Sequence, residues 1–178
     1  STKRANTLFI NQGVNGAGIP AFKDEAKQYG VADTGYSQNA AFFDYDKDGD
    51  LDLYVLTNLE SDKIPSNYRP RIVDGSALNN DRLYRNNDNG TFTDVTLEAG
   101  ILMEGYGLGL GIADINEDGW PDIYIGNDYV SNDVLYINNR DGTFTNEIKD
   151  RLKHQSLFSM GIDIADVNND KFPDIISL

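Results

Sequence analysis

The chain has 178 residues, enough for one domain with a sizeable hydrophobic core and too few for more than two domains. With 29 acidic against 15 basic residues the formal net charge is −14, which argues against nucleic acid or an anionic membrane as a partner and favours cations. The absence of cysteine excludes disulfides and thiolate metal sites, and a single histidine, His154, excludes a histidine-rich metal centre. Since no run of about 18 apolar residues occurs, the sequence predicts no membrane span.

Residues 1–37 are predicted to contain two strands. The first is Asn6-Thr7-Leu8-Phe9-Ile10-Asn11, and the second surrounds Phe22. In two later copies of this pair the corresponding aromatic positions are 8 residues apart, whereas Phe9 and Phe22 are 13 apart. The connection within the first pair is therefore expected to be longer.

An acidic loop, residues 44–52 (loop 1), is predicted to join the next two strands. Its flanks, residues 40–43 and 53–56, are short and rich in β-branched and aromatic residues, and its oxygen-bearing side chains recur at positions 1, 3, 5 and 9. Carboxylates this close repel each other unless a multivalent cation offsets their charge. Calcium fits best, because it takes about six to eight oxygen ligands, including the backbone carbonyl of position 7 in a tight loop.

The 22 residues that follow, from Asn58 to Asn79, form an insertion between the second and third strands of this unit. Basic and aromatic side chains gather there in an otherwise acidic chain: Lys63, Tyr68, Arg69 and Arg71. A solvated surface excursion is the favoured interpretation, because long loops are tolerated at little cost, and a partner-binding segment is the alternative.

The third and fourth strands of the unit are predicted at residues 80–87 and 91–94. Asn89-Gly90 between them is a strong hairpin signal. Both segments return 52 residues later, at 132–139 and 143–146. The intervening glycines Gly107, Gly109 and Gly111 lack the Lys-Ser or Lys-Thr of a phosphate loop, so a crowded inner strand explains them better.

The acidic loop also returns, without gaps, at residues 114–122 (loop 2) and 166–174 (loop 3). A solvated turn would also be rich in Asp, Asn and Gly, but three copies with the same spacing favour metal sites. An EF-hand is excluded, because its position 12 is Glu and here it is Val55, Ile125 or Ser177. The predicted ligands of up to three Ca²⁺ ions are Asp44, Asp46, Asp48, Asp50 and Asp52; Asp114, Asn116, Asp118, Trp120 and Asp122; and Asp166, Asn168, Asp170, Phe172 and Asp174.

Loop 3 departs from the other two at position 6. Lys171 stands there in place of glycine, at a sharp turn where a positive φ is expected, which costs about 1 kcal/mol for a residue with a Cβ. We therefore expect the third site to be the weakest.

Four antiparallel strands repeating at about 50 residues are typical of a β-propeller blade. The fold class is thus all-β, with twelve strands, or about three blades' worth of an incomplete ring. The predicted division is residues 1–37 for the last two strands of a preceding blade, 38–106 for a blade with the insertion 58–79, 107–157 for a blade, and 158–178 for two strands of a further blade. Because a ring needs about four to eight blades, further blades or other chains must complete it.

These repeats resemble the FG-GAP/VCBS repeats of integrin-α-like propellers, closest to the subgroup related to cartilage acidic protein and the ASPIC/UnbV proteins. The resemblance rests on segments such as Leu83–Asn87, Gly90–Thr96 and Asp114–Tyr124, and covers nearly all of the chain except the insertion. It implies about seven blades, a place outside the cytoplasm, and adhesion or ligand binding rather than catalysis.

The calcium loops are connections between first and second strands, so they are expected on the face opposite the insertion. Calcium is then interpreted as a staple of each blade, and a protein or glycan ligand is expected on the other face, near Tyr36, Met103 and Tyr106, with His154 as an ordinary surface residue there. An extracellular, periplasmic or cell-surface location follows from the calcium levels that such sites suit. The alternatives are an architectural subunit of a cell-envelope complex, or a non-catalytic part of a glycan-active enzyme, since the sequence shows no carboxylate pair outside the loops.

Overall fold

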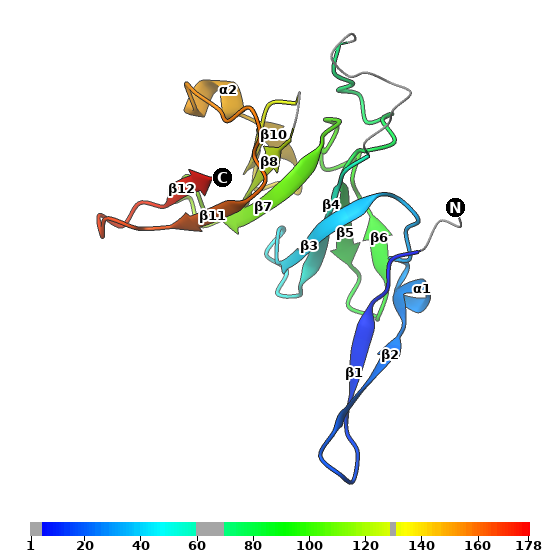
Figure 1. The fold of residues 1–178 in the computed structure, drawn as a ribbon. Coiled ribbons are helices and arrows are strands. Elements are labelled where there is room, and N and C mark those ends of the chain that lie inside the picture. The colour runs from blue at the N-terminus through cyan, green and yellow to red at the C-terminus, as the bar shows by residue number, and fades with distance from the viewer. Residues whose placement is uncertain (1–4, 60–69, 129–130) are drawn as a thin grey trace.

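The computed structural model describes residues 5–59, 70–128 and 131–178, which form two four-stranded and two two-stranded antiparallel sheets (Figure 1). The strands are β1 (Phe9–Val14), β2 (Pro20–Asp24), β3 (Ser37–Phe43), β4 (Asp52–Thr57), β5 (Arg82–Asn86), β6 (Phe92–Asp94), β7 (Gly107–Ala113), β8 (Asp122–Asn127), β9 (Val134–Asn138), β10 (Phe144–Asn146), β11 (Ile162–Ala165) and β12 (Asp174–Ser177). Two single-turn helices that the sequence patterns did not predict, α1 (Ala26–Tyr29) and α2 (Ile148–Arg151), follow β2 and β10.

The two four-stranded sheets are copies of one unit. Their strands pair in chain order, β3-β4-β5-β6 and β7-β8-β9-β10. Leu53 faces Tyr84 in the first sheet as Ile123 faces Tyr136 in the second, and the first strand of each sheet carries an irregularity near its start. The structure therefore confirms an all-β fold of antiparallel four-stranded blades that do not close into a ring.

The second strand of each sheet lies in the core. Every residue of β4 and β8 is buried, which explains why residues 53–56 and 123–125 read as continuous apolar runs rather than alternating ones. Side chains from both sheets meet in one hydrophobic cluster, among them Tyr54, Leu56, Leu83, Ile123, Ile125 and Tyr136. The two blades therefore share a core and are packed face to face.

Strand β7 lies between β3 and β4 on one side and β11 on the other. A Cβ atom on Gly109 would lie 2.6 Å from Ile162 Cγ1, and one on Gly111 would lie 2.7 Å from Ile164 Cδ1. These distances are shorter than any van der Waals contact between carbon atoms. The crowding predicted for this glycine-rich strand is confirmed.

In the two-stranded sheets, side chains are exposed on faces whose equivalents are buried in the four-stranded sheets. Figure 1 shows the β1–β2 hairpin extending away from the other sheets, and the β11–β12 hairpin packed beside β7. Phe9 is 61 % exposed, Phe22 58 % and Ile176 54 %. The division of the chain into blade segments at residues 37, 106 and 157 stays a prediction.

The insertion 58–79 runs between β4 and β5, and its residues 60–69, with Lys63, Tyr68 and Arg69, lie outside the described residues. In the part of the chain that the structure describes, no helix is long and apolar enough to cross a membrane.

Candidate metal sites

Loops 1, 2 and 3 join β3 to β4, β7 to β8 and β11 to β12, and they share one backbone conformation. Positions 4 and 6 have positive φ in every loop. The six residues are Lys47 (φ 59°) and Gly49 (98°), Glu117 (58°) and Gly119 (89°), and Asn169 (62°) and Lys171 (78°). The positive φ predicted for position 6 is confirmed, and Lys171 adopts it despite its Cβ.

Hydrogen bonds to the first and fifth side chains hold this conformation. The position-6 N–H donates to the position-1 carboxylate: Gly49 to Asp44 at 3.2 Å, Gly119 to Asp114 at 2.7 Å and Lys171 to Asp166 at 2.8 Å. The position-7 N–H donates to the position-5 carboxylate: Asp50 to Asp48 at 3.1 Å, Trp120 to Asp118 at 2.9 Å and Phe172 to Asp170 at 2.9 Å. The acidic side chains are therefore turned inward by the loop itself.

Loop 1 gathers a set of oxygens that can hold a metal ion. One carboxylate oxygen from each of Asp44, Asp46 and Asp48 lies within 4.8 Å of the others. Asp44 Oδ1, Asp46 Oδ1 and Asp50 Oδ1 are buried and accept no hydrogen bond. Buried carboxylate oxygens without a partner are costly. A hard divalent cation bound by these oxygens would remove that cost, so the residues present fit calcium.

The electrostatics of loop 1 agree with this geometry. Burial raises the pKa of Asp46, and the neighbouring charge of Asp48 raises it further. Burial and then repulsion from Asp48 likewise raise the pKa of Asp50. Both shifts reflect first the burial of the carboxylate and then the cost of ionising it beside other carboxylates.

The position-9 carboxylates of loops 1 and 2 tie their loops to the third strand of each blade. Asp52 is fully buried and accepts N–H bonds from Tyr45 at 3.1 Å and Asn86 at 2.8 Å. Asp122 accepts equivalent bonds from Ile115 and Asn138, both at 2.9 Å. Burial raises the pKa of Asp52 to about 6, although the two N–H bonds oppose the shift.

Loop 2 has fewer free oxygens. Asn116 replaces an acid at position 3 and donates to Asp118 Oδ2 at 2.9 Å. The guanidinium of Arg140, from the β9–β10 hairpin, also contacts Asp118 Oδ2, with Nη2 at 2.9 Å and Nε at 3.1 Å. Burial disfavours the charge on Asp118, but hydrogen bonds from Trp120, Arg140 and Asn116 outweigh it and lower the pKa.

Loop 3 is the most exposed of the three. Asp166, Asn168 and Asp170 are all exposed, whereas their counterparts in loop 2 are half-buried. The strands that cover loop 2, β9 and β10, have no counterpart for loop 3 among the described residues.

Loops 1 and 2 are in contact across the two blades. Asn138 Nδ2, in β9, donates to the carbonyl of Tyr45 in loop 1 at 2.8 Å. Lys47 Nζ in loop 1 lies 5.3 Å from the ring centre of Trp120 in loop 2, close enough for a cation–π interaction. The loops therefore lie at one common end of the blades.

Two buried acids that the sequence analysis treated only as repeat markers stabilise the opposite end. Asp81 Oδ2 accepts from the Tyr54 hydroxyl at 2.8 Å and Oδ1 from the N–H of Thr57 at 2.8 Å. Asp133 makes the same pair of bonds with Tyr124 and Asn127, at 2.8 and 2.9 Å. The signal that could have found them is their 52-residue spacing combined with Tyr54 and Tyr124, which lie two residues after the last acid of loops 1 and 2.

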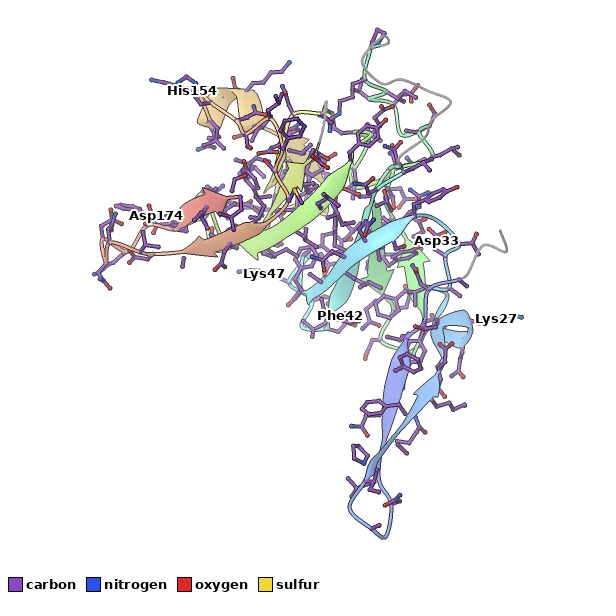
Figure 2. All side chains as sticks on the ribbon, in the orientation of Figure 1. Lys27, Asp33, Phe42, Lys47, His154 and Asp174 are labelled. Atoms are coloured by element: carbon purple, nitrogen blue, oxygen red, sulfur yellow. The ribbon has the colours of Figure 1, made fainter. Side chains whose placement is uncertain are left out.

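A cavity of about 320 Å³ lies at this opposite end, since β7 runs from Gly107 there to Ala113 at loop 2. Arg71, Met103, Tyr106 and Ser131 are among its lining residues. His154 is exposed beside α2, and Figure 2 shows it apart from Lys47 and Asp174 of the loop regions. The loops and the described end of the insertion are thus on opposite faces.

Comparison with known proteins fits these repeated blades and loops. Residues 72–125 and 114–177 each match the FG-GAP-like repeat. The chain belongs to this family. Together the two matches include loops 2 and 3 and all strands from β5 to β12. Membership of the FG-GAP family points to a non-enzymatic module.

The FG-GAP assignment is supported by a relative with an integrin name. The chain is 34 % identical over 92 residues to integrin alpha-7 of Homo sapiens. The alignment covers 46 % of this chain and 8 % of that protein, so the chain spans less than a tenth of the length of its relative.

Proposed function

We propose that this chain is a calcium-binding FG-GAP module of an integrin-α-like propeller, which binds a protein or glycan ligand in adhesion outside the cytoplasm. Calcium acts as a structural staple in this function. The observation that carries the proposal is loop 1, where Asp44, Asp46 and Asp48 converge and three buried carboxylate oxygens lack a partner.

Calcium suits these loops better than magnesium does. The predicted ligands are carboxylate, amide and backbone carbonyl oxygens drawn from one short loop, and calcium accepts such a crowded, flexible set. Magnesium usually keeps several waters and needs fewer protein ligands. Asp50, Trp120 and Phe172 would supply the position-7 carbonyls, and Asp52, Asp122 and Asp174 the ninth side chain in each loop.

The staple role follows from what the loops contact. Loop 1 is bonded to β5 through Asp52 and to the next blade through the carbonyl of Tyr45. An ion that fixes the loop would therefore fix both contacts. Because millimolar calcium fills sites of modest affinity, the module would work at the cell surface, in the periplasm or in the extracellular space.

The ligand face is proposed to be the end opposite the loops. Tyr36 is 44 % exposed there, and Met103 and Tyr106 line or border the cavity of about 320 Å³. Aromatic residues and methionine are enriched where proteins meet partners. A glycan array and a pull-down with extracellular proteins would test this part, and loss of a captured ligand on Tyr36→Ala would support it.

The exposed two-stranded sheets are proposed to pair with further blades or other chains. β1 and β12 each leave one edge unpaired among the described strands, and apolar side chains such as Phe9 and Ile176 are exposed beside those edges. Unpaired strand edges with apolar faces are sites of strand addition.

Calcium titration by calorimetry tests the central part of the proposal. The wild-type chain should bind Ca²⁺, and Asp46→Ala should remove one of the binding events. Asp150→Ala, the same change on the α2 surface, serves as the matched control and should leave binding unchanged. Asp170→Ala should remove the weakest event, because of Lys171. No heat of binding and no change on Asp46→Ala would refute the calcium assignment.

A further inference from the structure

Asp88 and Arg140 occupy the same place in the two blades. They are 52 residues apart and each follows a pair of asparagines at the start of a hairpin, between β5 and β6 or between β9 and β10. Their φ angles are 53° and 65°, so both side chains project from a left-handed backbone. The hairpins lie at the same end of the blades as loops 1 and 2, because Asp52 and Asp122 are bonded to Asn86 and Asn138 just before them.

In the second blade this position holds a cation against a predicted calcium ligand. Both Nη2 and Nε of Arg140 contact one oxygen of Asp118, at 2.9 and 3.1 Å. The Asp118 side chain is only 11 % exposed, whereas that of Arg140 is 55 % exposed. The guanidinium therefore covers the position-5 carboxylate from the solvent side.

In the first blade the same position holds an acid. Asp88 lies two residues after Asn86, whose N–H is bonded to Asp52 of loop 1, so this acid stands at the loop 1 end of its blade. Among the described residues no basic side chain pairs with the acids of loop 1, and three of its buried oxygens have no partner. In loop 2, the corresponding oxygen of Asp114 accepts an N–H bond from Asp118 at 2.9 Å. The charge of Arg85, which lines one pocket with Asp46, offsets part of the charge of loop 1, but no cation is bonded to its acids as Arg140 is to Asp118 of loop 2.

The opposite charges have opposite effects on a cation bound by the loops. A guanidinium bonded to a ligand oxygen repels a divalent ion that binds the same oxygen. When the ion binds, the guanidinium must either move away or stay and weaken the binding. A carboxylate at the same place attracts the ion. The left-handed backbone of Arg140 is unfavourable for a residue with a Cβ, and the contacts of its side chain with Asp118 offset part of that strain.

We infer that residues 88 and 140 set the calcium affinities of loops 1 and 2. The Arg140 guanidinium competes with calcium for Asp118 in loop 2, and the Asp88 carboxylate raises the calcium affinity of loop 1. The inference rests on the proposed calcium-binding function and adds regulation to it. The two neighbouring loops then fill at different calcium concentrations, loop 1 first. Loop 2 keeps its structure without the ion because Arg140 takes over part of the charge compensation.

The test uses the whole chain and Ca²⁺ as the probe. Loop 2 is isolated by Asp46→Ala and Asp170→Ala, which remove a predicted ligand from loops 1 and 3. Trp120, the single tryptophan, lies at position 7 of loop 2, so its fluorescence reports binding there. In this background Arg140→Gln should tighten the calcium dissociation constant about tenfold, the repulsion expected between charges of two and one at about 6 Å in water-like surroundings.

Two further variants separate competition from a merely structural role. Arg151→Gln makes the same charge change on α2, where Arg151 pairs with Glu147, and should leave the affinity unchanged. Asp88→Arg in the otherwise wild-type chain should weaken the calcium affinity of loop 1 by a similar factor. In EGTA, Arg140→Gln should also melt at a lower temperature than the wild-type chain, because Asp118 loses its partner. In saturating calcium the two melting temperatures should be equal.

An equal or weaker calcium affinity of Arg140→Gln would overturn the inference, because Arg140 would then position Asp118 for the ion. A melting deficit that persists in saturating calcium would overturn it as well. If the wild-type chain binds calcium in loop 1 and either of these two contradicting results is found, only the inference fails. If the wild-type chain binds no calcium, the proposed function fails with it.

Discussion

Lys171 holds a left-handed backbone at φ 78° where loops 1 and 2 have glycine. Replacing it by glycine removes the Cβ strain, so Lys171→Gly should stabilise the chain by up to about 1 kcal/mol. Urea unfolding measures the change. Asn169→Gly is the matched control at φ 62°, and it should gain less, because asparagine tolerates this conformation. A loss of stability in Lys171→Gly, or equal gains in both variants, would contradict the strain argument.

Asp81 makes the stability of the calcium-free chain depend on pH. Burial raises its pKa to about 6, against hydrogen bonds from Thr57 and Tyr54 that oppose the shift. Because the folded state then binds its proton more tightly than the unfolded state does, stability should fall as the pH rises from about 4 to about 6 and level off above that. The fall that Asp81 contributes should be on the order of 3 kcal/mol.

The pH dependence can be assigned by substitution. Asp81→Asn removes one titrating group and should make the fall of the unfolding free energy between about pH 4 and 6 clearly less steep, measured in EGTA by denaturant titration, while Asp52 still titrates there. Asp150→Asn, on the exposed helix α2, should keep the wild-type slope. An unchanged slope in Asp81→Asn would show that another acid carries it; Asp52, whose pKa burial also raises to about 6, is the next to replace.

Strand β7 depends on close approach to β11. Gly111→Ala would place a Cβ 2.7 Å from Ile164 Cδ1 and 2.9 Å from Ile162 Cγ2, so it should destabilise the chain by about 1–3 kcal/mol in thermal or urea unfolding. Ile164→Val removes the nearest methyl group and should recover part of this loss. Gly16→Ala, which has open space around its Cβ, is the control. A neutral Gly111→Ala would mean that β11 does not pack on β7.

The strands could be predicted because each carries a local signal that repeats. The Asn-Gly and Asp-Gly turns, the acidic loops and the 52-residue period together give all twelve described strands in order. Helices α1 and α2 could not be predicted, because each is a single turn of four residues with one buried side chain, Ala26 or Ile148. A single turn has no periodicity of its own, and tertiary packing decides whether it forms.

Only those parts of the candidate site that repeat along the sequence could be predicted. Spacing alone singled out Asp44, Asp46 and Asp48, which the structure brings together. It gave Asp52 the same weight, although that carboxylate is buried and bonded to β5. Arg140 escaped notice, because its contact with Asp118 joins residues 22 apart and has no counterpart in the other blade to repeat. Contacts that break the repeat are the ones that sequence reasoning misses.

At the scale of the whole molecule, 12 of the 29 acidic residues lie in three repeated loops at one end of the blades. Such a surface is unfavourable without cations, since like charges gather where the blades meet. Binding of ions only to the folded chain would stabilise it by mass action, by about 2.7 kcal/mol for one site at a hundredfold excess over its dissociation constant. The module would then be most stable where calcium is abundant.

Thermal unfolding of the chain in calcium and in EGTA tests this account most directly. Millimolar calcium should raise the melting temperature by roughly 5–10 °C over EGTA, and the triple variant Asp46→Ala, Asp118→Ala and Asp170→Ala should lose most of that rise. Magnesium at the same concentration should give a smaller shift. A melting temperature that is the same in calcium and in EGTA would contradict the calcium-stabilised module.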